Sequence, residues 1–285
     1  MVERRPHPWN IGFEWDDHDG TRCTTISAEQ AKAYDEVGYF VVDDALDTAT
    51  ITALDAELVA HDELGRRFLE GIPEGRFGVT GLDSQIVSPH PVRTSALARE
   101  LVAHPVLAGI ARDLLGPDVR LYWDQTVYKQ PHGSEPVLWH QDNGYTFVEP
   151  QSYLTCWVAL TDATLTNGCV HVMPGVHRGG TLWHQHTDIG EECWGDFADA
   201  VAVPVRAGSI VVFTSLTPHA TRVNTTDAVR KAYIVQYAPD GAQALYGDPS
   251  AGPPRRRVHL DDPARQFPVV VGGERVSPPP LPTTA

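Results

Sequence analysis

The chain has 285 residues, a hydrophobic fraction of 42% and a net charge of -15, and a chain of this length can bury one substantial core. Its acidic balance excludes binding to a phosphate backbone, which needs a basic surface, and no apolar run approaches the roughly 20 residues that span a bilayer. Because the N-terminal segment contains no apolar signal core, we expect a cytoplasmic protein that binds neither nucleic acid nor a membrane.

Helical patterns dominate the N-terminal part of the chain. Ser27 and Gln30 have the spacing of a capping box, which predicts the start of a helix, and Gly38 is expected to end it. Residues 16–19, which are acidic apart from one histidine, are expected to be solvated. The expected elements are, in chain order, a polar arm at 1–24, a helix at 27–36, a buried strand at 39–42, and helical stretches at 48–61 and 95–115.

From Val119 onward the apolar pattern changes to a period of two, which predicts strands. Strands are expected at 119–129, 153–160, 169–173, 209–214 and 232–238. One face of the first strand is shared by Leu121, Trp123, Gln125, Val127 and Lys129. Helices first and short strands afterwards predict an α+β fold. The barrel would be a double-stranded β-helix of the jelly-roll or cupin-like kind, with the N-terminal helices packed on its outer sheet.

We expect one domain over residues 1–285. Within it, we expect mainly helical support at 25–117, the jelly-roll core at 118–246, and a tail rich in Pro, Gly and Arg at 247–285.

A candidate metal site lies in the segment WHQD. His140 and Asp142 are two positions apart, so an extended backbone places both side chains on one face, within reach of one ion. His219 is the best third ligand, because it follows an apolar strand and a turn-like Leu-Thr-Pro sequence. Two imidazoles and one carboxylate leave three of six octahedral positions open, which suits iron(II) with a chelating cosubstrate and oxygen. By itself a His-x-Asp pair is weak evidence in a chain with 13 histidines.

A more specific signal comes from Arg230, eleven positions after His219 at the head of the last predicted strand. A guanidinium binds a carboxylate through two hydrogen bonds, and its charge does not depend on pH. A dianionic cosubstrate gains nothing from the field of an acidic chain and needs such a local cation. Arg230 is therefore a candidate anchor for the distal carboxylate of 2-oxoglutarate.

The sequence resembles the phytanoyl-CoA dioxygenase family of iron(II)/2-oxoglutarate oxygenases in two stretches, WHQDNGYTFVEPQSYLTCWVALTDATLTNGCVHVMPGVHRGG and HATRVNTTDAVRKAY. The shared features occur in the family's order: the WHQD segment, the W-x-A-L strand, the NGC and PG-x-H turn, and a distal His with a downstream Arg. The close match covers about residues 119–240. The N-terminal part is similar more loosely, through QAKAYDEVGYFVV and LLGPDVRLY.

The resemblance implies a role for individual residues. His140, Asp142 and His219 would bind iron, and Arg230 would hold the distal carboxylate of 2-oxoglutarate. The remaining matches are Thr221, which would assist Arg230, Lys129, which would lie near the cosubstrate, and Trp157, whose place would be the barrel interior. The sequence departs from the family in PGVH, where PGSH is usual, and in KQP, where KPP is usual, and the second departure bears on the cosubstrate contacts.

The implied activity is a dioxygenase reaction. Oxygen and 2-oxoglutarate would be consumed, succinate and CO2 released, and an unactivated C–H of a small molecule hydroxylated or otherwise oxidised. Asp142 favours this outcome over halogenation, because related halogenases carry a small residue at that position. Three alternatives remain open: a non-catalytic barrel that binds a metal or small molecule, an acyl-CoA hydroxylase, and a metal hydrolase. The hydrolase is disfavoured because no further acid or His has the spacing of a general base.

The substrate is expected to be a free small molecule, such as a natural-product intermediate. Binding of an acyl-CoA would favour basic residues, and the only basic run is 255–257. His184 and His186 are expected to be pocket-wall or solvent residues, although with Asp188 they imitate a metal site. The pocket is expected to be walled by the segments 77–88, 143–147, 183–194 and 237–246.

Overall fold

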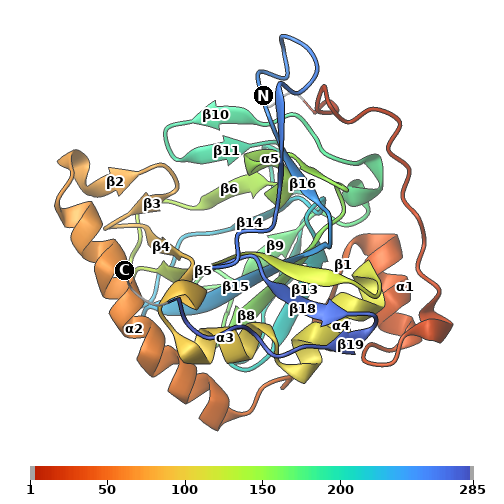
Figure 1. Ribbon diagram of the computed structural model, residues 1–285. Helices are drawn as coiled ribbons and strands as arrows, with labels where there is room; N and C mark the ends of the chain where they lie inside the picture. The colour runs from red at the N-terminus through yellow and green to blue at the C-terminus, as the bar shows by residue number, and fades with distance from the viewer. Residues whose placement is uncertain (1–3, 283–285) are drawn as a thin grey trace.

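The computed structural model describes residues 4–282 and packs two antiparallel β-sheets face to face (Figure 1). The larger sheet consists, in spatial order, of β1 (Tyr39–Val42), β13 (Ile210–Thr214), β8 (Leu154–Ala159), β15 (Arg230–Pro239), β5 (Val119–Lys129), β4 (Gln85–Pro89), β3 (Thr80–Gly81) and β2 (Arg76–Phe77). The smaller sheet consists of β12 (Val201–Val203), β9 (Val170–Val172), β14 (His219–Thr221) and β6 (Val137–His140). This arrangement is a double-stranded β-helix, so the predicted fold class is confirmed.

Two smaller strand groups lie beside the barrel. One is the three-stranded sheet β17 (Arg256–His259), β16 (Gln243–Tyr246) and β7 (Val148–Glu149), and the other is the hairpin β10 (Gln185–Thr187) and β11 (Gly190–Glu192). The hairpin occupies part of the segment 183–194, for which the sequence predicted a pocket wall. Figure 1 shows it at the end of the barrel where β6 and the one-turn helix α5 (Asp142–Tyr145) also lie.

Helices cover the outer face of the larger sheet. They are α1 (Ala28–Val37), α2 (Thr48–Glu70), α3 (Ala96–Val102) and α4 (Pro105–Leu115) (Figure 1). The capping box of α1 is present in both directions, and Gly38 ends the helix at a φ of 87°. Among residues 4–282, no helix has the length and the apolar character needed to span a membrane.

Two helical predictions were wrong in extent. Helix α2 continues nine residues past His61 to Glu70, and its last turn buries Leu69. The stretch at 95–115 is two helices, because Pro105 holds His104 in an extended conformation and lacks the N–H that a continuous helix would use.

A large apolar core joins the helices to the outer face of the larger sheet. It packs Leu54 of α2 and Leu107 of α4 against strand residues such as Val235 of β15. Phe267 and Val269 belong to the same core, and β18 (Pro268–Val271) pairs with both β5 and β19 (Glu274–Arg275). The segment at 247–285 is therefore more than the tail that its composition suggested, because it adds a strand to the main sheet.

The inner face of the larger sheet is where polar residues gather. The alternation predicted for β5 places Trp123, Gln125 and Lys129 on this face, opposite Gln236, Ile234 and Arg230 of β15. Leu121 is an exception, because the register shifts between Gln236 and Tyr237 and turns Leu121 into the helix-side core. A β-bulge therefore ends the polar face of β5 at Trp123.

Candidate active site

Three potential metal ligands meet at the end of the smaller sheet. His140 ends β6, Asp142 begins α5, and His219 begins β14, where it pairs directly with His140. One ligand atom from each of the three residues lies within 4.8 Å of the other two. Asp142 Oδ1 is 3.9 Å from His140 Nε2 and 3.8 Å from His219 Nε2. The sequence predicted this trio, and the fold brings it together with its donor atoms converging.

Both imidazoles are held with Nε2 available. Nδ1 of His140 donates to the Leu138 carbonyl at 2.8 Å, and Nδ1 of His219 donates to the Thr217 carbonyl at 3.0 Å. A carbonyl only accepts, so the ring proton lies on Nδ1 and Nε2 keeps its lone pair. Burial, with a contribution from His219, lowers the pKa of His140 well below its ordinary value. Nε2 of each ring is thus placed as a donor atom of the kind that binds a transition metal.

The carboxylate of Asp142 is oriented from the side away from the two histidines. Thr155 of β8 donates its hydroxyl to Asp142 Oδ2 at 2.6 Å, which leaves Oδ1 toward the imidazoles. Gln236 of β15, which faces Thr155 in the sheet register, donates from Nε2 to Thr155 Oγ1 at 3.3 Å. Neither Thr155 nor Gln236 was predicted from the sequence. The available signal was a polar side chain two positions before Trp157, on the same face of a strand that is otherwise apolar.

Two buried cations occupy the inner face of the larger sheet at its other end. Arg230 is 1% exposed, and its Nε and Nη2 atoms have no hydrogen-bond partner among residues 4–282, while Nη1 makes one long contact of 3.5 Å with the Val127 carbonyl. Lys129, its neighbour across the β15–β5 pair, is fully buried. Within residues 4–282, neither cation forms an ion pair with a carboxylate. A buried charge without a partner costs several kcal/mol, so this arrangement is suited to an anionic ligand.

The environment of Lys129 defines what we call the cation end, made of Arg230, Lys129, Thr221 and Gln85. The Lys129 ammonium donates to Thr221 Oγ1 at 3.0 Å and to Gln85 Oε1 at 3.2 Å. Burial, with Arg230 as a second cause, lowers the pKa of Lys129 well below its ordinary value. Burial lowers the pKa of Arg230 to about 10, so the guanidinium stays charged at neutral pH. The Thr221 hydroxyl, expected beside Arg230, bonds to Lys129, and Gln85 was not anticipated.

Two residues shape the cation end without charge. Trp157 is buried, and the Arg230 guanidinium carbon lies 5.1 Å from the centre of its ring, so the predicted interior position is found together with a cation–π contact. Gly168 of the NGC sequence has a φ of 85°, and a Cβ there would lie 2.9 Å from Lys129 Cδ and 2.6 Å from the Arg222 carbonyl oxygen. The absence of a side chain at Gly168 therefore leaves room for the Lys129 side chain.

The metal segment is fixed from behind by a buried amide. The Gln141 side chain donates to the Gly180 and Leu216 carbonyls and accepts from the Leu182 N–H. The Gln141 backbone N–H donates to Nε2 of His184 at 2.9 Å. His184 is 7% exposed, and burial lowers its pKa to about 4. His184 is therefore a support of the metal segment, and the solvent position that was one of its two expected locations is wrong.

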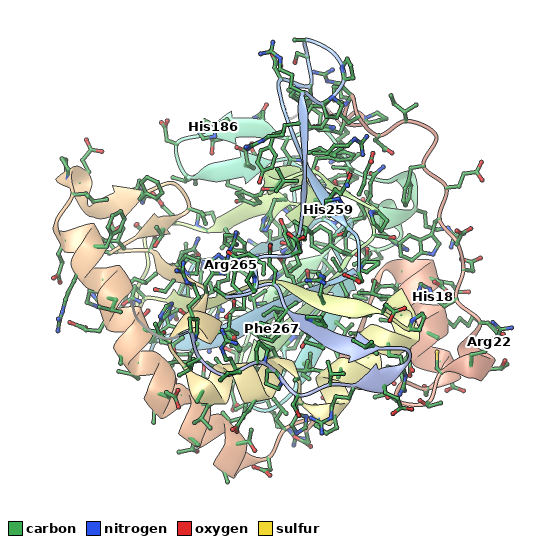
Figure 2. All side chains as sticks on the ribbon, viewed as in Figure 1. His18, Arg22, His186, His259, Arg265 and Phe267 are labelled. Atoms are coloured by element: carbon green, nitrogen blue, oxygen red, sulfur yellow. The ribbon has the colours of Figure 1, made fainter. Side chains whose placement is uncertain are left out.

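His186 and Asp188, which with His184 resembled a metal site in the sequence, are both exposed. Figure 2 shows His186 out on the β10–β11 hairpin, where its side chain is 81% exposed and contacts Glu191. Within residues 4–282, the trio of His140, Asp142 and His219 is the one cluster with metal-binding geometry.

The N-terminal arm also supports this region, which its composition did not suggest. Asn10 accepts from the Gln151 amide and donates to the Gly179 and Thr181 carbonyls. Gln151 in turn accepts from Thr181, whose hydroxyl accepts from Asn143, the residue after Asp142. The arm is thus joined to α5 through a chain of buried side chains.

The solvated character expected for residues 16–19 is wrong at His18. Its ring, labelled in Figure 2, lies between the Asp35 carboxylate, at 2.6 Å, and the Leu114 carbonyl, at 2.9 Å. The other three residues of this segment are exposed.

Beyond the metal trio, the inner face of the larger sheet presents uncharged polar side chains in place of the two cations. What we call the uncharged end comprises Gln125, Trp123, Gln236 and Thr155. Trp123 Nε1 donates to Gln125 Oε1 at 2.9 Å, and both of these side chains are partly exposed although they lie on the inner face of the barrel. The guanidinium carbon of Arg265, a residue labelled in Figure 2, lies 5.9 Å from the centre of the Trp123 ring, and its charge is already engaged because the side chain bonds to Asp262 and His90. Of the predicted pocket segments, 143–147 contributes Tyr145, whose ring lies 5.1 Å from that of His140.

A model of the family described as Phytanoyl-CoA dioxygenase (PhyH) matches residues 34–232. The chain belongs to this family. This phytanoyl-CoA dioxygenase family member is 26% identical over 228 residues to the methylphosphonate hydroxylase of Gimesia maris, which covers 75% of the chain and 81% of that enzyme. It is also 30% identical to the phytanoyl-CoA dioxygenase of Arabidopsis thaliana over 118 residues, which covers 38% of the chain and 40% of the plant enzyme.

Solved structures of similar proteins agree with this membership. SnoK, a non-heme alpha-ketoglutarate-dependent carbocyclase from nogalamycin biosynthesis, is 31% identical with a TM-score of 0.63, over 77% of this chain and 86% of SnoK. EvdO2 from Micromonospora carbonacea var. aurantiaca, solved with 2-oxoglutarate, is 25% identical with a TM-score of 0.58, over 75% of this chain and 91% of EvdO2. The predicted family and its reaction class, that of a non-haem iron 2-oxoglutarate-dependent oxygenase, are confirmed.

Proposed function

We propose that this family member oxidises an unactivated C–H bond of a small molecule, with iron(II) held by His140, Asp142 and His219 and with 2-oxoglutarate as cosubstrate. The observation that carries the proposal is the pair of buried, carboxylate-free cations beside a three-ligand cluster. A dicarboxylate anchored at one end by these cations satisfies charges that the chain itself leaves unpaired. The bound metal and cosubstrate supply oxygen activation and release succinate and CO2.

Residues of the chain itself would bind the cosubstrate carboxylate, exclude water from it and provide the place for the substrate. Arg230 presents two unpartnered nitrogen atoms, which match the two oxygens of a carboxylate. Lys129 can donate to the same carboxylate, whose negative charge would favour the protonated form of the lysine, and Thr221 accepts a hydrogen bond from Lys129 Nζ. Burial of the cation end excludes water and strengthens these contacts. The partly exposed inner face at Trp123 and Gln125 is the place for the substrate.

The alternatives are less compatible with these contacts. A non-catalytic barrel that binds a metal or small molecule has no use for a buried dicarboxylate anchor next to an open metal site. An acyl-CoA needs cations for its phosphates, and the Arg257 side chain of the only basic run already pairs with Glu149. A metal hydrolase needs a free general base near the ligands, whereas His184 is engaged through both ring nitrogens.

The proposal is tested by following succinate formation from 2-oxoglutarate in the presence of iron(II), oxygen and candidate small molecules. We expect slow succinate release without substrate and faster release with one. The Asp142→Ala variant should lose both activities together with its affinity for iron(II). Absence of any succinate from the wild-type protein, combined with unchanged iron(II) affinity in Asp142→Ala, would contradict the proposal.

A further inference from the structure

The Asp142 carboxylate has two oxygen atoms in different surroundings. Oδ1 faces Nε2 of both histidines, whereas Oδ2 accepts the Thr155 hydroxyl at 2.6 Å. A short hydrogen bond to an ionised carboxylate is a strong one, because one of the two partners is charged. Thr155 is 1% exposed and sits in the middle of the larger sheet, so its side chain is held by strands on both sides.

The direction of each hydrogen bond in this region follows from chemistry. A carboxylate only accepts, so the single hydroxyl proton of Thr155 must go to Asp142. The lone pairs of Thr155 Oγ1 can then only accept, and the group that faces them is the Gln236 amide. Gln236 must therefore present Nε2 to Thr155, and its amide oxygen is directed elsewhere. No group among residues 4–282 forms a hydrogen bond to that oxygen.

We propose that Thr155 and Gln236 are positioning residues that hold Asp142 with Oδ1 toward the metal. This inference rests on the proposed function, because it assigns Asp142 to the metal. The relay runs from Gln236 through Thr155 to Asp142, and it leaves the Gln236 amide oxygen as an acceptor at the uncharged end. A substrate group that meets this oxygen has to be a hydrogen-bond donor, such as a hydroxyl or an N–H.

A second side-chain amide, that of Gln125, is oriented the opposite way from that of Gln236. An indole N–H only donates, so the Gln125 oxygen must face Trp123, and the Gln125 amide nitrogen has no hydrogen-bond partner within the described part of the chain. Gln125 and Gln236 are diagonal neighbours on adjacent strands, since Gln236 is paired with Trp123 and Gln125 with Ile234. Such diagonal positions are about 7–8 Å apart, a spacing that one small molecule can bridge. The uncharged end thus offers one acceptor and one donor, and no free charge.

The relay is tested through metal affinity, which does not require a known substrate. Thr155→Val removes the hydroxyl at nearly constant shape, Thr155→Ser keeps it, and Gln236→Leu removes the outer donor. Thr126→Val is the matched control, because Thr126 is also a buried strand threonine and its hydroxyl has no hydrogen-bond partner in the range 4–282. Anaerobic titration with Co(II) gives the dissociation constant and an absorption spectrum that reports the coordination geometry.

We expect Thr155→Val to weaken Co(II) binding by about 10- to 100-fold and to change the spectrum, as loss of a partner of a metal ligand commonly does. Thr155→Ser should return the affinity to within about threefold of the wild type, Gln236→Leu should give a smaller loss than Thr155→Val, and Thr126→Val should have no effect. Wild-type affinity and spectrum in Thr155→Val would overturn the relay, and wild-type affinity in Gln236→Leu would remove Gln236 from it.

Folding and the proposed function are controlled separately. Thermal unfolding of each variant identifies a folding defect, and Thr155→Ala replaces Thr155→Val if the valine variant does not fold. If the wild-type protein itself binds no Co(II) or iron(II), the proposed function fails. If the wild type binds metal and Thr155→Val binds it equally well, only the relay fails.

Discussion

The two ends of the inner face of the larger sheet differ in the kind of ligand that they can bind. At the cation end, Arg230 and Lys129 are register partners across β15 and β5, and both are buried with no carboxylate partner among residues 4–282. Six residues further along β15, Gln236 stands beside Trp123, and only amides, an indole and a hydroxyl are presented. The same two strands therefore combine a site that requires a charged ligand with one that suits an uncharged ligand.

This difference has a physical origin in solvation. A buried cation is stabilised by an anion far more than by water, so the cation end discriminates by charge. Amides with one free donor or acceptor discriminate by hydrogen-bond direction, and they reject a group that leaves them unpaired. The comparison predicts that substitutions at the cation end act on 2-oxoglutarate, whereas those at the uncharged end act on the metal ligand or the substrate.

The largest expected effect is that of Arg230→Met. It removes the two nitrogens that would bind the cosubstrate carboxylate, and charged hydrogen bonds are worth about 1.5–3 kcal/mol each, so 2-oxoglutarate affinity should fall by about 100-fold or more. The measurement is the KM for 2-oxoglutarate in succinate release without added substrate. Arg120→Met, which removes an arginine paired with Asp240, is the control and should leave that KM unchanged. An unaltered KM in Arg230→Met would remove the cation end from the account.

Lys129→Met should have a smaller effect on 2-oxoglutarate, about tenfold in KM, because Arg230 remains. Its effect on stability has a definite sign. The lowered pKa means that the folded protein holds fewer protons at Lys129 than the unfolded chain does between that pKa and 10.5. Wild-type stability should therefore rise with pH across this interval, and Lys129→Met should be more stable and less dependent on pH there. Denaturant unfolding of both proteins without cosubstrate at several pH values checks this; equal pH slopes would contradict it.

Gly168→Ala tests the packing of the cation end. The added methyl group would press on Lys129 Cδ and the Arg222 carbonyl, and the φ of 85° is unfavourable for alanine. We expect the KM for 2-oxoglutarate to rise by a few-fold to about tenfold, with a loss of about 1–2 kcal/mol in the free energy of unfolding. Gly179→Ala, where a Cβ would meet nothing within 4 Å, should change neither quantity. Equal behaviour of the two variants would show that Gly168 does not act on Lys129.

The smallest expected effect is at Gln125, and it concerns substrate alone. Succinate release should be stimulated by uncharged molecules that carry a hydroxyl or N–H near a carbonyl or ether oxygen, and not by methylphosphonate or a CoA thioester. With a stimulating compound, Gln125→Leu should raise its KM by about two- to fivefold, which corresponds to about 0.5–1 kcal/mol for one neutral hydrogen bond, without changing the KM for 2-oxoglutarate. Gln243→Leu, at an exposed amide bonded to His259, is the control. Stimulation by methylphosphonate or the thioester alone would contradict the uncharged character of this end.

The parts of the site that the sequence predicted are those carried by short motifs. His140 and Asp142 lie two positions apart, so an extended backbone is enough to place them together. His219 and Arg230 could be identified because a family motif fixes their order. The fold class followed from helical spacing before Val119 and a period of two after it, which are local properties of the chain.

The parts that escaped prediction depend on contacts between distant segments. Gln236 reaches Thr155 only because β15 pairs with β8 in one register, and a shift by a single residue would turn the amide to the other face. Leu121 was placed on the wrong face because a bulge is not visible in an alternating pattern. His184 and Asn10 support the metal segment through packing of polar segments that carry no periodic signal.

The central claim is that the metal trio and the two buried cations form one site for iron(II) and 2-oxoglutarate. The most direct test is an anaerobic titration of 2-oxoglutarate into the iron(II)-loaded wild-type protein, followed by visible absorption. We predict a saturable metal-to-ligand band in the wild type, no band in Asp142→Ala, and a band in Arg230→Met only at about 100-fold higher 2-oxoglutarate. A wild-type protein without the band, or an Arg230→Met variant that saturates at the wild-type concentration, would contradict the account.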